Sequence, residues 1–182
     1  MRNEFKSVLK LLFTLAFINS IGGLSLELAS KKLIQVVPII ILLPALSHMC
    51  GSFGTIISSK FTSLLFKGKI SKKGIKDNDL KILFKNLFYI VIISSIYISI
   101  FSFVISPLRD YKFNFSHLIK IPIFVLIVSL SLFIVNFNVA IFTGLYLYRK
   151  KKDPDDFLVP ITTTISDFGS IVLITILSVM FL

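Results

Sequence analysis

The sequence predicts an all-α membrane protein with five transmembrane helices, and two features of the whole chain indicate this class. The 182 residues are 55% hydrophobic and their mean hydropathy is +0.90, which is more apolar than a soluble domain of this size. The apolar residues also gather in long runs that carry almost no charge, as expected of segments that cross a bilayer. The single cysteine, Cys50, excludes an intrachain disulfide and a zinc site built on cysteines.

The charge balance is strongly basic, with 20 Lys+Arg, 9 Asp+Glu and a net charge of +11. A sequence pI near 9.8 is also typical of proteins that bind nucleic acid. Here, however, the basic residues flank the apolar runs and form no separate basic domain. We therefore expect the lipid bilayer, and no nucleic acid, as the partner of these charges.

Five spans account for the apolar runs, at about residues 7–30, 33–59, 82–106, 117–148 and 157–182. The apolar run of the first span comes after Arg2, Lys6 and Lys10, as in a signal peptide, but no clean small-x-small cleavage site follows it, so we expect an uncleaved span. Pro38 and Pro44 predict a bend in the second.

The later spans differ in length and in their flanking residues. The third is an apolar run that holds one charged residue, Lys85. The fourth is long for a bilayer, so part of it is expected to be tilted or interfacial. The fifth follows Asp155 and Asp156, which match the free N–H groups and the positive dipole end of a helix start.

An odd number of spans places the two termini on opposite sides of the membrane. With the N-terminus in the cytoplasm, fifteen of the 20 basic residues fall in cytoplasmic segments, so the positive-inside rule predicts N-in and C-out. The longest loop, about 60–81, is rich in lysine and suits a cytoplasmic linker near anionic lipid. Because the first span begins within ten residues, we expect 1–182 to be a single transmembrane domain with no cytoplasmic sensor domain.

Asp167 is the only carboxylate in residues 157–182. A lone charge inside a span costs a few kcal/mol even on lenient scales, and it is retained mainly where it meets a partner, water or an ion. Asp167 lies ten residues beyond Phe157, which is about 15 Å along a helix and therefore near the middle of a core about 30 Å thick. This position predicts a functional carboxylate.

The residues before Asp167 add oxygen atoms to the same helical face. Seven residues make almost two turns, so one face is shared by Pro160, Thr163, Thr164 and Asp167. Hydroxyl and carbonyl oxygens suit a hard cation that keeps its waters. The threonines are explained equally well by helix packing, whereas the carboxylate has no such simple structural use.

The second span carries a matching polar stripe. Spacings of four, three and four place on one helical face His48, Ser52, Thr55 and Ser59. Gly51 and Gly54 flank Ser52 and permit close approach of another helix. For this stripe alone, packing through small residues is the simpler interpretation.

Other acidic residues lie near the ends of spans. Glu27 is expected near the outer end of the first span, where it pairs with Lys31 at i+4 or marks a cation entrance. Asp153, Asp155 and Asp156 are candidates for the inner mouth, where they would offset the basic residues. The same three would also fit a metal–phosphate group of an intramembrane enzyme. No second motif or base accompanies them, so an enzyme is not expected.

Two segments resemble the membrane domain of the MgtE/SLC41 family of magnesium transporters and channels. The second-span segment is Pro44-Ala45-Leu46, Gly51-Ser52-Phe53-Gly54 and Ser58-Ser59-Lys60-Phe61-Thr62-Ser63, followed by Gly68. The fifth-span segment is Asp153-Pro154-Asp155-Asp156, Pro160-Ile161-Thr162-Thr163-Thr164 and Asp167. The five-span order and the N-in, C-out orientation are also similar.

The resemblance implies a homodimer of five-helix units whose pore is lined by the second and fifth spans. It implies that Asp167 is the principal magnesium-site carboxylate, with Thr163 one turn before it. Ser52 stands where the family often has asparagine, which removes an amide carbonyl from the pore. The bacterial channels also carry acidic and CBS sensor domains, which we do not expect in this chain.

These interpretations predict a multi-pass cell-membrane protein that transports divalent cations, with Mg²⁺ as the transported ion. The candidate metal-site residues are Asp167, Thr163, Thr164 and Ser52; the candidate pore or helix-packing residues are Gly51, Gly54, Thr55 and Pro160. The alternative is a non-transporting membrane subunit that assembles with a partner or regulates it. The sequence leaves open the ion preference and the choice between a channel and Na⁺- or H⁺-coupled exchange.

Overall fold

A computed structural model describes residues 2–35, 37–68, 78–109 and 115–181. The elements in these ranges are α1 (Arg2–Gln35), α2 (Val37–Phe66), α3 (Asn78–Ile105), the short 3-10 helix η1 (Ser106–Arg109), α4 (Phe115–Arg149) and α5 (Pro154–Phe181). The five α-helices are each long and apolar enough to cross a membrane. The predicted all-α class with five spans is therefore confirmed.

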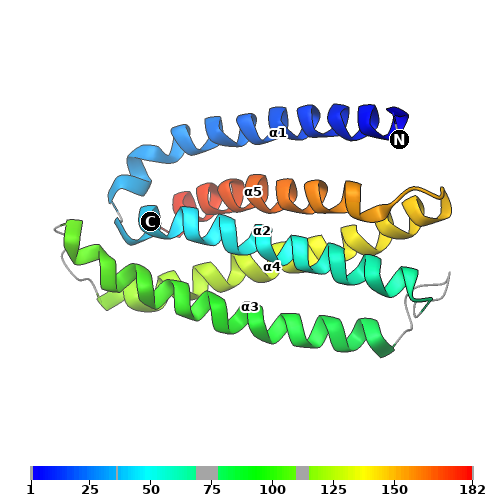
Figure 1. Cartoon of the computed structure of the whole chain (residues 1–182). Helices are drawn as coiled ribbons and strands as arrows, with labels where there is room; N and C mark the ends of the chain where they lie inside the picture. Colours follow the sequence, from blue (N-terminus) through cyan, green and yellow to red (C-terminus); the bar gives the residue numbers. More distant parts are fainter. Residues whose placement is uncertain (1, 36, 69–77, 110–114, 182) are drawn as a thin grey trace.

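The helices lie side by side along one long direction, and successive helices run in opposite directions (Figure 1). As a result, α1 begins at one end of the bundle and α5 ends at the other (Figure 1). The two ends of the chain are thus separated by the length of the bundle, as an odd number of spans requires. Which end faces the cytoplasm stays a prediction from the basic residues.

The core lies between α2, α3, α4 and α5. Leu46, Val91, Val125 and Leu158, one from each of these helices, have no exposed surface. α5 contacts α1, α2 and α4, whereas α3 packs on α2 and α4 and lies on the side of the bundle away from α1 (Figure 1). α1 is peripheral, since only 6% of its most apolar stretch is buried.

The boundary between the first two spans differs from the prediction. Residues 33–35 belong to α1, and α2 begins at Val37 and continues to Phe66, past the predicted end at residue 59. Pro38 falls in the first turn of α2, where its missing N–H needs no partner. Beyond the exposed Lys60, Phe61 and Leu65 continue the buried face with 1% and 2% exposure. A charged residue on the outer face therefore did not end the helix.

Pro44 lies inside α2, which continues past it as one helix, and the bend expected at the prolines stays a prediction. The lysine-rich loop is shorter than predicted, because α2 extends to Phe66 and α3 begins at Asn78. Most of its remainder, residues 69–77, lies outside the described residues.

A tight connection places α5 directly after α4. Lys151 has a φ of 56°, and the backbone N–H of Lys152 donates to the carbonyl of Leu147 (3.1 Å), which closes the last turn of α4. The backbone N–H of Asp155 donates to Asp153 Oδ1 (3.0 Å). Asp153 is thus the N-cap of α5 and Pro154 its first residue, an arrangement that satisfies a free N–H group and favours helix initiation.

Candidate functional site

Asp167 lies half-buried at the contact between α5 and α2. Its Oδ1 atom accepts a hydrogen bond from Ser47 Oγ of α2 (3.1 Å). One turn further along α2, a Cβ atom at Gly51 would lie 3.6 Å from Asp167 Oδ1 and 3.5 Å from Thr163 Cγ2. The carboxylate therefore faces the bare backbone of α2, and the structure brings Gly51, Thr163 and Asp167 together.

The side of α2 that faces α5 consists of small residues at spacings of four, three and four, namely Ser47, Gly51, Gly54 and Ser58. A Cβ atom at Gly54 would lie 3.1 Å from the carbonyl oxygen of Thr162. The hydroxyls of Ser58 and Thr162 are 3.0 Å apart and share a hydrogen bond. We call these four residues the α5-facing stripe; their small size allows α2 and α5 to approach backbone to backbone.

The polar stripe predicted from the sequence follows the α5-facing stripe by one residue, which is about 100° around the helix. Its members His48 and Ser52 are exposed, and Thr55 and Ser59 are half-buried. The Thr55 hydroxyl donates to the carbonyl of Gly51 (3.1 Å) in its own helix. Ser59 donates to Asp155 Oδ1 (3.2 Å) at the start of α5. This stripe therefore borders the contact between α2 and α5, and Ser52 lies exposed at that border.

The four residues predicted to share one face of α5 do not all meet the same neighbours in the structure. Pro160 and Thr163 are half-buried, like Asp167, and the Thr163 hydroxyl donates to the carbonyl of Val159 (2.6 Å). Because the Thr163 hydroxyl uses its single proton in this bond, its oxygen can act toward other groups only as an acceptor. Thr164 is buried one turn before Phe168, which packs against Gly22 of α1. Thr164 thus lies toward α1, and it does not join the group around Gly51.

A buried polar network behind Asp167 was not predicted from the sequence. Asn136 of α4 donates from Nδ2 to Ser166 Oγ (2.6 Å), and Ser166 Oγ lies 3.0 Å from the carbonyl oxygen of Cys50 and 2.9 Å from that of Thr162. Ser166 directly precedes Asp167, so this network fixes the position of α5 against α2 and α4. The signal in the sequence was two amides within the apolar fourth span, Asn136 and Asn138, because amides commonly bond across helices. Asn138 instead donates to the carbonyl of Ile134 in its own helix (2.8 Å).

The direction of each hydrogen bond in this network follows from its acceptors. The carbonyl oxygens of Cys50 and Thr162 only accept, so the single Ser166 proton points to one of them. Asn136 must then present its NH₂ group to Ser166. Among the described residues, Asn136 Oδ1 is left as a buried acceptor without a partner. Asn136 itself is 1% exposed, so its orientation is fixed by the chemistry of its neighbours.

The acidic residues predicted for the pore mouths lie apart from Asp167. Asp153 lines a surface hollow of about 780 Å³ together with the three basic residues Arg149, Lys151 and Lys152, in addition to its role as a helix cap. Asp155 and Asp156 are exposed in the first turn of α5, and Glu27 is exposed on α1. The side chain of Lys31, the predicted partner of Glu27, lies outside the described residues.

Among the described contacts, the polar atoms near the Asp167 carboxylate include the hydroxyl oxygens of Ser47, which bonds to it, and of Thr163, whose side chain meets the same glycine. Within the described ranges, no three His, Cys, Asp or Glu side chains gather in a group that would hold a metal ion. A single carboxylate with hydroxyl oxygens near it is the kind of ligand through which a hydrated Mg²⁺ ion is commonly contacted.

Five apolar helices with a carboxylate at the contact between two of them define a multi-pass membrane protein with a polar site inside its bundle. The family profile of MgtE, described as a divalent cation transporter, matches residues 43–177. The chain therefore belongs to the MgtE divalent cation transporter family, as the sequence resemblance indicated, and this is a family of transporters and not of enzymes. The match begins inside α2 and ends inside α5, so it does not include α1. No curated protein and no solved structure was found to match.

Proposed function

We propose that this protein transports Mg²⁺ through a pore between two copies of the chain, lined by α2 and α5, with Asp167 of each copy as the main contact for the hydrated ion. The observation that carries the proposal is the half-buried Asp167 carboxylate against the Gly51 backbone. Its hydrogen-bond donor, the Ser47 hydroxyl, is neutral. That bond orients the carboxylate and leaves its negative charge available to a cation.

The kind of ligand supports the choice of Mg²⁺. Carboxylate and hydroxyl oxygens suit hard cations, whereas softer transition metals favour imidazole and thiolate groups. Cys50 is close in sequence to Gly51, but its side chain is buried. Mg²⁺ loses its waters reluctantly and is commonly bound through one or two carboxylates plus water. Two Asp167 side chains would match the charge of one such ion.

The proposed dimer follows from the partial exposure of this face. Ser47, Thr163 and Asp167 are half-buried and Ser52 is exposed in the single chain. A polar, partly open face in a membrane-spanning bundle needs cover from water or from protein, because lipid cannot satisfy it. A second copy related by a two-fold axis would cover the face with the same surface and complete a pathway between them.

Magnesium uptake into proteoliposomes tests the proposal. We expect vesicles with wild-type protein and an inside-negative potential to take up Mg²⁺, measured by an enclosed Mg²⁺-sensitive dye. Asp167→Asn, which keeps the size and removes the charge, should lower uptake about tenfold or more, because a charged contact with the ion is lost. Asp79→Asn, at the start of α3, is the control for the removal of one carboxylate and should retain uptake.

Each outcome separates the rival hypotheses. Unchanged uptake with Asp167→Asn would remove Asp167 from the site. No uptake by the folded wild-type protein would favour the alternative of a non-transporting subunit. Repeating the measurement with and without a Na⁺ gradient distinguishes passive flow from exchange, since only a coupled transporter would respond to the gradient.

A further inference from the structure

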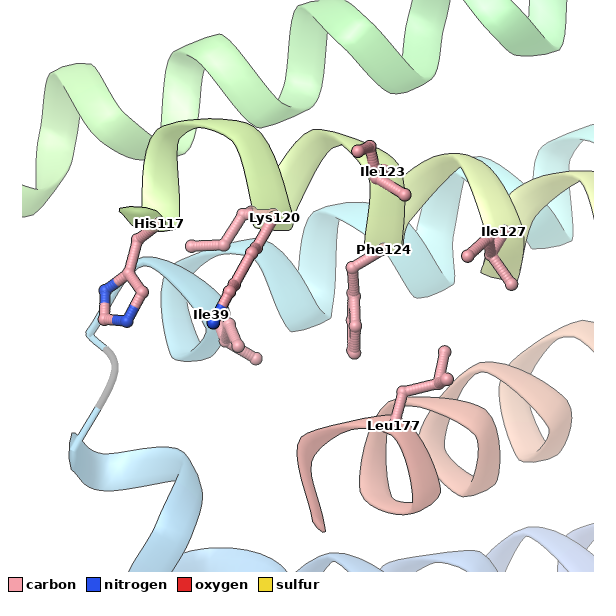
Figure 2. Close-up of a pocket in the computed structure, with 8 residues that line it drawn as sticks. Ile39, His117, Lys120, Ile123, Phe124, Ile127 and Leu177 are labelled. Carbon is pink, nitrogen blue, oxygen red and sulfur yellow. The ribbon is translucent and has the colours of Figure 1, made fainter. Parts of the chain in front are cut away.

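We propose that a groove at the end of the bundle where α2 and α4 begin and α5 ends binds one phospholipid. Its acyl chain would lie among apolar side chains and its phosphate beside Lys120. The groove has a volume of about 210 Å³ and lies between the three helices (Figure 2). This proposal depends on the membrane location of the protein and not on the transport of any ion.

The inner part of the groove is suited to hydrocarbon. It is lined almost wholly by apolar atoms, with Ile39 from α2, Phe124 and Ile127 from α4, and Leu177 from α5 (Figure 2). Ile39 and Phe124 are buried in the core, whereas Ile127 is 44% exposed, so the groove opens on the outer surface of membrane-spanning helices. Lipid tails and not water surround such a surface.

The rim of the groove is positive. The Lys120 side chain runs from α4 toward Ile39 and ends with its nitrogen there, and the His117 ring points to the same side (Figure 2). Both residues lie in the first two turns of α4, and Ile39 lies in the first turn of α2. Neither helix has an acidic residue in its first turn. The positive dipole ends of these two helix starts therefore add to the charge of Lys120 and favour an anion.

One molecule with an anionic head and an apolar tail fits both parts. Lys120 and Ile127 are seven residues apart, which is about 10 Å along α4. A phosphate at Lys120 would thus place the first part of an attached acyl chain along Phe124 and Ile127. A soluble anion would fill only the rim, and a neutral lipid would leave the Lys120 charge without a partner.

Fluorescence quenching tests the site, because the chain contains no tryptophan and a single introduced tryptophan reports without background. Ile123→Trp places the reporter at the groove, where Ile123 is 52% exposed. Tyr97→Trp is the matched control on α3, where Tyr97 is 65% exposed. Ile123 lies eight residues after the start of α4, and Tyr97 lies eight residues before the end of α3. The start of α4 and the end of α3 lie at the same end of the bundle (Figure 1). Both proteins are reconstituted with phosphatidylglycerol or phosphatidylcholine that carries brominated acyl chains.

We expect the Ile123→Trp reporter to show about fivefold stronger binding of phosphatidylglycerol than of phosphatidylcholine, as one basic side chain near the surface supplies. The ratio of phosphatidylglycerol binding to phosphatidylcholine binding, which we call the lipid ratio, should be near one for Tyr97→Trp. Adding Lys120→Gln to Ile123→Trp should bring the ratio near one, and Lys120→Arg should preserve it. A ratio near one at Ile123→Trp, or one that survives Lys120→Gln, would overturn the proposal.

A soluble anion is excluded by competition. Millimolar inorganic phosphate can reach Lys120 but has no acyl chain, so it should leave the lipid ratio unchanged. Loss of the ratio in phosphate would show that the rim binds a free anion and would contradict the assignment to lipid.

Discussion

At the scale of single residues, Gly54 sets how closely α2 approaches α5. A Cβ atom at this position would meet the Cβ, carbonyl carbon and carbonyl oxygen of Thr162 at 3.1 to 3.2 Å. These atoms belong to a helix backbone or lie next to it, so they cannot turn aside as the end of a long side chain can. The neighbouring pair formed by Ser47 and Asp167 depends on the same spacing.

Gly54→Ala should therefore destabilise the protein by about 1–3 kcal/mol through overpacking. It should also reduce uptake, because α2 is pushed away from Asp167. Gly23→Ala is the control, since nothing lies within 4 Å of its Cβ position, and alanine there should be neutral or stabilising by up to about 1 kcal/mol. Thermal unfolding in detergent measures both; equal stability of the two variants would contradict the tight contact.

The residues of the site could be predicted from the sequence only in part. Asp167 was evident, because a carboxylate in an apolar run is costly and conspicuous. On α2, the sequence indicated the polar stripe from His48 to Ser59 and two flanking glycines, Gly51 and Gly54, and these glycines lie on the stripe that faces α5. The α5-facing stripe and the predicted polar stripe both consist of small or polar residues at the same spacings. Periodicity therefore cannot tell which of the two stripes faces α5. The rotation of α2 is set by contacts such as Gly54 with Thr162, which only the folded chain contains.

At the scale of elements, the Asn136–Ser166 hydrogen bond joins α4 to α5, and Ser166 continues the network to the backbone of α2 at Cys50. Both side chains are at most 1% exposed. Inside a membrane bundle such bonds contribute modestly, because separated helices find other partners. Here the network also fixes the rotation of α5, and Asp167 is the next residue.

A double-mutant cycle tests this coupling. Asn136→Ala and Ser166→Ala should each cost about 1–3 kcal/mol, since each leaves a buried polar group without its partner, and the double variant should cost less than their sum. Ser166→Ala should also raise the Mg²⁺ concentration at half-maximal uptake. Ser178→Ala is the control, because its buried hydroxyl bonds to Thr175 in its own helix. Additive effects at Asn136 and Ser166 would show that the two residues act independently.

Whole elements were predicted better than their ends. The five apolar runs exceed the length that a bilayer requires, so composition alone located the helices. The ends depend on finer features: Pro38 is favourable in a first turn, and Phe61 and Leu65 keep α2 helical beyond Lys60 because they pack in the core. Hydropathy does not distinguish a lysine that ends a span from one on the outer face of a longer helix.

At the scale of the whole molecule, the N-in, C-out orientation can be tested by labelling with a membrane-impermeant thiol reagent. In a Cys50→Ala background, the positive-inside rule predicts that Lys67→Cys, just after α2, reacts from the cytoplasmic side. Leu108→Cys, which lies just after α3 at the other end and is 82% exposed, should react from outside. The reverse pattern would invert the assigned orientation.

The proposed pairing of two copies can be tested in the same background. Ser52→Cys lies exposed beside the α2–α5 contact, so a short bis-maleimide should link two copies into a covalent dimer in the membrane. Tyr97→Cys, exposed on α3 across the bundle from α1, should remain monomeric. Equal cross-linking at both positions would indicate random encounter and not a specific interface.

The contact of Gly22 with Phe168 has a consequence for how the protein is made. The two residues are separated by about 150 residues of chain, which takes on the order of 10 s to synthesise. During that time α1 is already in the membrane, while α5, the helix that it packs against, has not yet left the ribosome. A chain that stops before α5 would leave α1 without this neighbour and the faces of α2 and α4 uncovered. Such a fragment would be a natural target for the proteases that remove unfinished membrane proteins.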